Sequence, residues 1–217
     1  MYPISRYLNI QQAYFPSFAP DGQHIAFLSN ITGTPQVWRV ALASQPGQVL
    51  WPDQLTFEAD RVLGVWYSPV DDGQLLYARD VGGNENAQLF LLRTDGAEEI
   101  PLTQGYENAM HIFGEWSQDG KHILFAANRR HPGLFDLYLQ PLDGDAHMVW
   151  QHDQPGFLHD LMFAPDGQHA VVSRTSSAFR HDLFEIDLQT GTVRHVAPRA
   201  ARARRAAAAV RRWWNRP

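Results

Sequence analysis

Three adjacent histidine–aspartate pairs are the residues of this sequence best suited to acid–base or metal chemistry. An imidazole beside a carboxylate becomes a general base when a further group orients it or supplies a nucleophile. The sequence places no third partner beside any of the three, so we expect no catalytic, cofactor-binding or metal site. Two of these histidines, His159 and His181, are candidates for lining one end of the fold. The pairs are His152–Asp153, His159–Asp160 and His181–Asp182.

Three further histidines share one position of a repeated pattern. His24, His122 and His169 each stand two residues after a glycine. A residue that recurs in register indicates a strand start that faces solvent rather than a ligand. The chain has no cysteine, which excludes disulfides and thiolate metal sites. It also lacks the G-x-S-x-G sequence of a serine nucleophile elbow.

The elements that position these residues come from an internal repeat. The heptapeptide FAPDGQH occupies residues 18–24 and returns at residues 163–169. Weaker copies are YSPVDDGQ at 67–74 and WSQDGKH at 116–122, so the glycines are spaced by 51, 47 and 47 residues. Self-similarity at such a period is typical of a repeat architecture.

Each repeat contains an Asp-Gly turn between two apolar runs, which predicts a hairpin. Glycine adopts a positive φ without a Cβ clash, and the aspartate side chain bonds to nearby backbone N–H groups. We therefore expect a structural role for these residues and no catalytic one. The predicted turn residues are Asp21, Gly22, Asp72, Gly73, Asp119, Gly120, Asp166 and Gly167.

Each repeat predicts four short strands. Several of these predicted strands are apolar at consecutive positions, which is typical of strands that are covered on both faces. This predicts an all-β fold, a partial β-propeller of four four-stranded blades in an open arc. We expect blades at about residues 10–57, 58–104, 105–152 and 153–197 within a single domain. Two columns of aromatic residues should pack between blades: Phe18, Tyr67, Trp116 and Phe163, and Trp38, Phe90, Tyr138 and Phe184.

Charge is distributed unevenly along the chain. Residues 198–217 hold seven of the 18 basic residues and no acidic one, which leaves 11 basic and 23 acidic residues in 1–197. The acidic body argues against nucleic-acid binding. The Ala/Arg-rich tail predicts a disordered segment or a marginal helix, either a basic helix for a membrane or nucleic acid or the product of out-of-frame translation. We favour the second, since GC-rich DNA read out of frame yields Arg, Ala and Pro.

The repeats resemble the SPDG propeller repeats of TolB-like proteins and of prolyl-oligopeptidase-family serine peptidases. ISRYLNIQQAYFPSFAPDGQHIAFLSNITGTPQVWRV resembles the opening blade of acylaminoacyl-peptidase-like and dipeptidyl-peptidase-like members. HIFGEWSQDGKHILFAANRRHPGLFDLYLQPLDG and DLMFAPDGQHAVVSRTSSAFRHDLFEIDLQTG resemble later blades. The resemblance covers about residues 3–197.

In that family the propeller caps an α/β-hydrolase domain and limits entry to small peptides. The resemblance thus implies the non-catalytic, substrate-gating part of a peptidase, truncated before its hydrolase domain. Two alternatives stay open: a freestanding TolB-like interaction propeller, and a propeller subunit completed by a separate hydrolase chain. Dipeptidyl-peptidase-like members hold a substrate amino terminus with a glutamate pair, but Glu98 and Glu99 follow a turn and are not given that role.

These interpretations set the expected partners and location. The expected partners are peptides or a hydrolase domain. We expect no cofactor, no nucleic acid and no membrane as partners. The chain could also self-associate through its open blade faces. No signal peptide or apolar run of membrane-spanning length occurs in the sequence, so a cytoplasmic location is expected.

Overall fold

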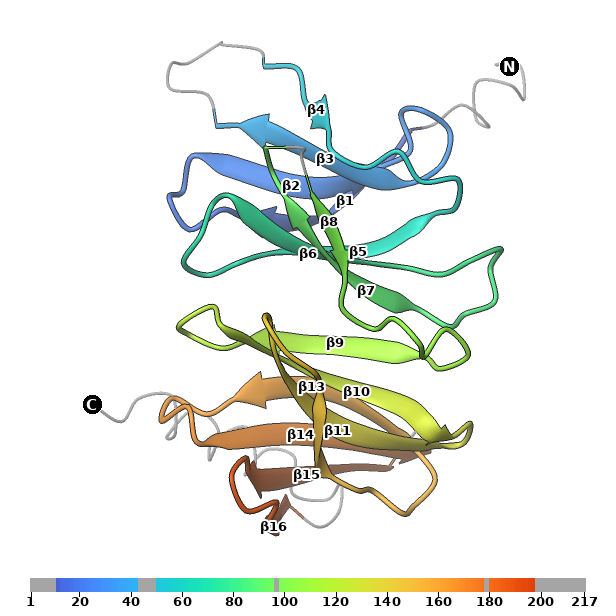
Figure 1. Cartoon of the computed structure of the whole chain (residues 1–217), viewed down its shortest axis with the longest axis vertical. Helices are drawn as coiled ribbons and strands as arrows, with labels where there is room; N and C mark the ends of the chain where they lie inside the picture. Colours follow the sequence, from blue (N-terminus) through green and yellow to red (C-terminus); the bar gives the residue numbers. More distant parts are fainter. Residues whose placement is uncertain (1–10, 43–49, 96–97, 178–179, 198–217) are drawn as a thin grey trace. The chain divides into compact units, whose positions relative to one another are not determined.

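The computed structural model describes residues 11–42, 50–95, 98–177 and 180–197. The expectations for the tail, residues 198–217, fall outside this range. Contacts group the chain into two compact units that meet in sequence at Glu107 and Asn108. Within the described ranges every regular element is a β-strand (Figure 1).

The first unit contains two antiparallel sheets, each built from four consecutive strands (Figure 1). Blade one consists of β1 (Ala13–Phe18), β2 (His24–Ser29), β3 (Gln36–Ala41) and β4 (Asp53–Gln54). Blade two consists of β5 (Val62–Tyr67), β6 (Gln74–Arg79), β7 (Gln88–Arg93) and β8 (Glu99–Pro101).

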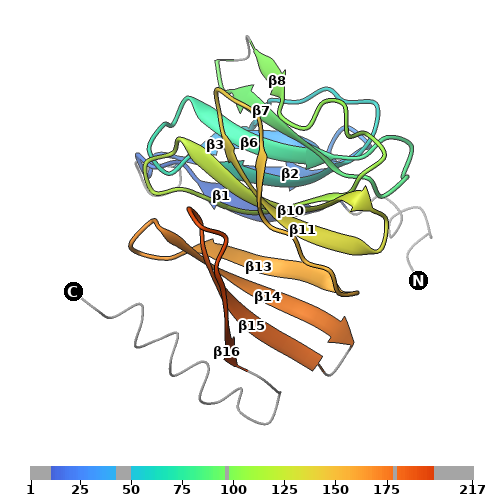
Figure 2. The ribbon, with the colours of Figure 1, turned by 60° about the horizontal axis from the view of Figure 1, so that its bottom comes forward.

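The second unit repeats this plan with longer strands. Blade three consists of β9 (His111–Trp116), β10 (His122–His131), β11 (Leu134–Pro141) and β12 (His147–Trp150). Blade four consists of β13 (Phe157–Phe163), β14 (His169–Ser177), β15 (Arg180–Asp187) and β16 (Val193–Ala197), and its meander is clearest in Figure 2.

Four separate four-stranded antiparallel sheets, one for each sequence repeat, are the blades of a partial β-propeller. The fold class expected from the repeats is therefore confirmed. Among the described residues no helix has the length and apolar character needed to cross a membrane.

Apolar side chains from both blades form the core of each unit. In the first unit Tyr67 packs with Leu28 and Val37 of blade one. In the second, Leu158 and Val172 of blade four pack with Leu137 of blade three. These contacts explain the runs of consecutive apolar residues, because both faces of an inner strand are covered.

A side chain of one blade also binds the innermost strand of the next in both units. The Tyr67 N–H donates to Ser17 Oγ at 2.9 Å, and the Phe163 N–H donates to Glu115 Oε2 at 2.7 Å. Burial raises the pKa of Glu115, and the hydrogen bond from Phe163 opposes that rise. These inner-strand ties fix the register between neighbouring blades.

One predicted core aromatic, Phe18, is instead 63% exposed. The equivalent Tyr67 is buried against the preceding blade, and Phe163 packs partly buried in the core shared with blade three. No blade precedes β1 in the described part of the chain, so no equivalent surface covers Phe18.

The turns follow the sequence pattern in three blades. Gly22, Gly120 and Gly167 have φ values of 67°, 68° and 66°, in the left-handed region that favours glycine. The carboxylates before them accept backbone N–H groups two residues further on, in the pairs Asp21–Gln23, Asp119–Lys121 and Asp166–Gln168.

The turn of blade two departs from the prediction. Asp71, not Asp72, accepts the N–H of Gly73 at 2.8 Å, and Gly73 does not adopt a left-handed φ. The segment between the aromatic and the glycine is two residues longer here than in the other repeats. The added residues lengthen the turn, and the aspartate two positions before the glycine becomes the acceptor.

Candidate functional site

The two residues of the first histidine–aspartate pair, His152 and Asp153, differ in their exposure to solvent. His152 is buried, and its backbone N–H donates to Asp136 Oδ1 at 2.8 Å. Burial, followed by the nearby charge of Arg174, lowers the pKa of His152. Asp153 is exposed and forms an ion pair with Arg130 at 2.9 Å. The two side chains therefore do not act as one acid–base unit.

The second pair, His181 and Asp182, lies on β15, where consecutive side chains point to opposite faces of the sheet. Asp182 is buried, whereas His181 is exposed. Asp182 Oδ2 accepts a hydrogen bond from Arg174 Nη2 at 2.6 Å, and its Oδ1 lies 3.3 Å from Nε2 of His195. Burial raises the pKa of Asp182, but the hydrogen bond and charge of Arg174 outweigh it, so the pKa is lowered overall.

The pair on β13 is the one whose members interact, and the structure supplies the partners that the sequence could not place. His159 Nδ1 lies 2.8 Å from Asp160 Oδ2, and its Nε2 makes a short contact with Thr175 Oγ1. Thr175 Oγ1 lies 2.8 Å from Nδ1 of His181. A chain of polar contacts thus runs Asp160–His159–Thr175–His181, which we call the histidine–threonine cluster.

Strand register brings this cluster together. Thr175 pairs with His181 across β14 and β15, and with Phe157 across β13 and β14. A bulge between His159 and Met162 interrupts the second pairing, and Asp160 lies in it with a φ of 46°. The bulge redirects the chain locally, and Asp160 contacts the histidine that precedes it.

Gly156 is required where β13 begins. Its φ is 136°, and a Cβ there would lie 2.8 Å from the carbonyl oxygen of Thr175. Any other residue would be strained and would push β13 away from β14. Glycine therefore allows the close approach on which the cluster depends.

A second recurrent polar feature lies at the start of the third strand of each blade. Each third strand carries one aromatic residue of the second column, which is Trp38, Phe90, Tyr138 or Phe184. The residue two positions before this aromatic is buried in all four blades. We call the polar contacts of this residue the strand latch. The latch residues are Gln36, Gln88, Asp136 and Asp182.

The latches of the first unit are neutral. In blade two, Gln88 Oε1 accepts from Thr103 Oγ1 at 2.8 Å, and Thr103 Oγ1 accepts the N–H of Leu89 at 3.1 Å. Blade one has the same arrangement between Gln36 and Thr56. The amide and hydroxyl join the third strand to the outermost segment of the blade.

The latches of the second unit are charged. Asp136 accepts two hydrogen bonds from the Arg130 guanidinium, at 3.1 and 3.0 Å. Asp182 pairs with Arg174, whose Nη1 also donates to Gln154 Oε1 at 2.5 Å. The Arg174 guanidinium lies 5.2 Å from the ring centroid of Phe184, within the range of a cation–π contact.

Glu99, on the outermost strand of blade two, bonds to a buried tyrosine. The Tyr77 hydroxyl lies 2.5 Å from Glu99 Oε2 and 2.8 Å from Glu58 Oε1. Burial, then the hydrogen bonds to these carboxylates, raises the pKa of Tyr77 well above its usual value. Glu58 is also paired with Arg79 at 3.2 Å. The arrangement joins the outer segment to the middle of blade two, although Glu98 and Glu99 are both exposed.

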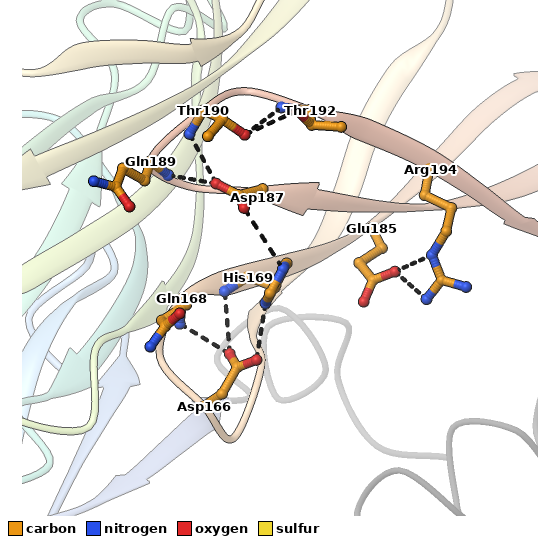
Figure 3. Close-up of polar contacts among 9 residues, drawn as sticks. All are labelled: Asp166, Gln168, His169, Glu185, Asp187, Gln189, Thr190, Thr192 and Arg194. Atoms are coloured by element: carbon orange, nitrogen blue, oxygen red, sulfur yellow. Dashed lines mark hydrogen bonds and ion pairs between the residues drawn. The ribbon is translucent and has the colours of Figure 1, made fainter.

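The repeated histidine position is partly exposed in all three blades that carry it, and in blade four it links two turns. His169 Nδ1 lies 2.8 Å from Asp166 Oδ2, and Nε2 lies 3.8 Å from Asp187 Oδ2 (Figure 3). Both carboxylates also accept backbone N–H groups of their own turns. His169 therefore connects the β13–β14 turn to the β15–β16 turn.

Among the described residues, no three or more His, Cys, Asp or Glu side chains gather as a metal-binding group. The polar contacts found there join strands and turns, and the histidine–threonine cluster is the one that places imidazole nitrogens against a shared hydroxyl near the surface.

Comparison with known proteins gives structural matches alone. No protein-family model matches the sequence, and no curated protein matches it. A protein described as TolB from Agrobacterium tumefaciens matches with a TM-score of 0.65 at 19% identity, over 88% of this chain and 63% of that chain. An oligogalacturonate lyase in complex with manganese matches with a TM-score of 0.68 at 15% identity, over 85% and 53%.

An acylaminoacyl peptidase matches with a TM-score of 0.54 at 18% identity, over 85% of this chain and 32% of that chain. The chain thus spans less than two thirds of each of these proteins. At such identities the matches show fold alone. The chain has β-propeller blades similar to those of TolB and of prolyl-oligopeptidase-family peptidases.

Proposed function

We propose that this chain is the non-catalytic propeller portion of a prolyl-oligopeptidase-family peptidase, in which it gates and orients peptide substrates for a hydrolase domain. The structural match to the acylaminoacyl peptidase carries the proposal. The opening repeat, residues 4–40, supports it because it resembles the opening blade of that family.

A gate that excludes folded proteins by size must keep its shape. The inner-strand ties Ser17–Tyr67 and Glu115–Phe163 join the two blades of each unit, and the strand latches join the third strand of each blade to its neighbouring segments. Within each unit such contacts favour a rigid pair of blades over a surface that remodels around a partner.

The second candidate is a freestanding TolB-like interaction propeller. It is favoured by the higher TM-score of the Agrobacterium tumefaciens protein, 0.65 against 0.54 for the peptidase. Under this alternative the chain would bind a protein partner and need no hydrolase domain. A propeller subunit completed by a separate hydrolase chain is a variant of the first candidate.

Reading the DNA that follows codon 217 in all three forward frames would test the first candidate. We expect one frame to resume the Asp-Gly repeats, complete the propeller, and then encode G-x-S-x-G followed by Asp and His. About 450 codons would suffice for three or four blades and a hydrolase domain of ordinary size. Their absence from all frames would contradict the single-chain form of the proposal.

Affinity purification from the native host separates the remaining forms. A stoichiometric α/β-hydrolase partner, with release of nitroanilide from acylaminoacyl reporters, would support the two-chain form. The chain alone should release none, because acyl transfer needs an activated nucleophile and oxyanion donors. A stoichiometric partner without hydrolase sequence would favour the interaction propeller.

A further inference from the structure

We propose that the histidine–threonine cluster binds one divalent transition-metal ion of the zinc or copper class, with His159 and His181 as the nitrogen ligands. The inference is independent of the peptidase proposal. It goes against the expectation from sequence, because that expectation rested on histidine–aspartate pairs that had no visible third partner.

The three donor atoms of the cluster lie close enough together to share one ion. His159 Nε2 and His181 Nδ1 both contact Thr175 Oγ1. The distance from His181 Nδ1 to this oxygen is 2.8 Å. Zinc ligands lie about 2.1 Å from the metal in a tetrahedral site, so neighbouring ligand atoms lie about 3.4 Å apart. A small shift of the three side chains would place an ion within reach of both nitrogens and the hydroxyl oxygen.

Asp160 prepares His159 for this role. Its carboxylate accepts a hydrogen bond from Nδ1 at 2.8 Å, which places the proton on Nδ1 and leaves the Nε2 lone pair directed at Thr175. Metal-binding histidines almost always donate their second N–H to such an outer partner. The carboxylate also adds a negative charge beside the ion.

The cluster is accessible and its residues lie on paired strands. His181 is exposed, and His159 and Thr175 are partly exposed. Thr175 and His181 are directly paired across adjacent strands, and Gly156 holds β13 against β14. The ligands therefore come from three strands whose mutual positions are fixed by the sheet.

The donor set indicates the class of ion. Two imidazole nitrogens with one neutral oxygen suit zinc, copper or nickel, whereas magnesium and calcium prefer carboxylate and carbonyl oxygens. Because the protein supplies at most three ligands, water would complete the coordination shell. Arg180 lies nearby in sequence, but its guanidinium pairs with Asp182 at 3.8 Å.

Isothermal titration of the untagged chain with zinc chloride at pH 7.5 tests the proposal. We expect one ion per chain, and at least tenfold weaker binding in His159→Gln and in His181→Gln. His147→Gln is the matched control, since His147 is also an exposed strand residue of the second unit. Equal zinc affinity in wild type and in the His159→Gln/His181→Gln double variant would overturn the proposal.

Asp160→Asn gives a second test that preserves the backbone, because asparagine tolerates the left-handed φ of this residue. The amide oxygen can still accept the Nδ1–H of His159, but loss of the carboxylate charge should weaken zinc binding about tenfold. With copper, electron paramagnetic resonance should show coupling to two imidazole nitrogens; a spectrum without nitrogen coupling would contradict the assignment. Circular dichroism melts establish that each variant is folded.

Discussion

The two units hold the third strand of each blade in place with different kinds of polar contact. In blades one and two the latch residue is a glutamine that bonds to a threonine hydroxyl. In blades three and four the same position holds an aspartate that bonds to an arginine guanidinium. Both versions are buried, and both join the third strand to neighbouring segments of its blade.

The difference teaches what each latch requires. A glutamine carries donors and acceptors on one neutral group, so a threonine and backbone carbonyls satisfy it. A buried carboxylate needs compensating cations, because an unpaired charge is costly in the protein interior. This explains why Asp182 lies among Arg174, Arg180 and His195.

Asp182→Ala should have the largest effect of the changes considered. The side chain is 3% exposed, and its removal leaves Arg174 buried without its carboxylate. Loss of one partner of a buried ion pair costs about 3–5 kcal/mol. Urea unfolding followed by hydrogen exchange of β15 peptides measures the loss, with peptides of the first unit as an internal control. Unchanged protection of β15 would show that the charged latch is dispensable.

Thr103→Val should have a smaller effect on the first unit. Valine keeps the shape but removes the hydroxyl that bonds to both Gln88 Oε1 and the Leu89 N–H. Leaving buried polar groups unpaired costs about 1–3 kcal/mol. The same measurement on β7 peptides tests this. A loss as large as that of Asp182→Ala would remove the distinction between neutral and charged latches.

Local patterns explain how much of the fold could be predicted from the sequence. The Asp-Gly turns and the apolar runs are encoded by neighbouring residues, so the repeats predicted four four-stranded blades. The prediction was wrong for Phe18, whose burial depends on a neighbouring blade rather than on its own repeat. The acceptor at the second turn changed because two added residues alter the hairpin.

The histidine–threonine cluster shows why sequence gave little information about the site. His159, Thr175 and His181 come from three strands, and their meeting depends on pairing register and on a bulge next to Asp160. A shift of one residue would turn Thr175 to the opposite face of the sheet. One signal was available, since hairpin pairing of HAVVSRTSS with the following strand predicts which residues lie opposite each other.

Acidification should distinguish the two kinds of latch. The pKa of Asp182 is lowered in the folded state, because the hydrogen bond and charge of Arg174 outweigh the effect of burial. Its contribution to stability is therefore complete above the ordinary value of about 3.9 and is lost as the pH falls through the folded value. The stability difference between wild type and Asp182→Asn should shrink below about pH 4. The difference for Thr103→Val should stay constant, because neither latch partner there titrates.

Asp153→Asn should have the smallest effect, although it also removes a carboxylate from an arginine of the second unit. Asp153 is 63% exposed, and Arg130 remains bonded to Asp136 through two hydrogen bonds. Exposed ion pairs contribute little, because water solvates both partners. Urea midpoints of wild type and Asp153→Asn should coincide, whereas Asp136→Asn should lower the midpoint clearly. If Asp153→Asn proved as damaging as Asp136→Asn, charge rather than burial would determine what a latch contributes.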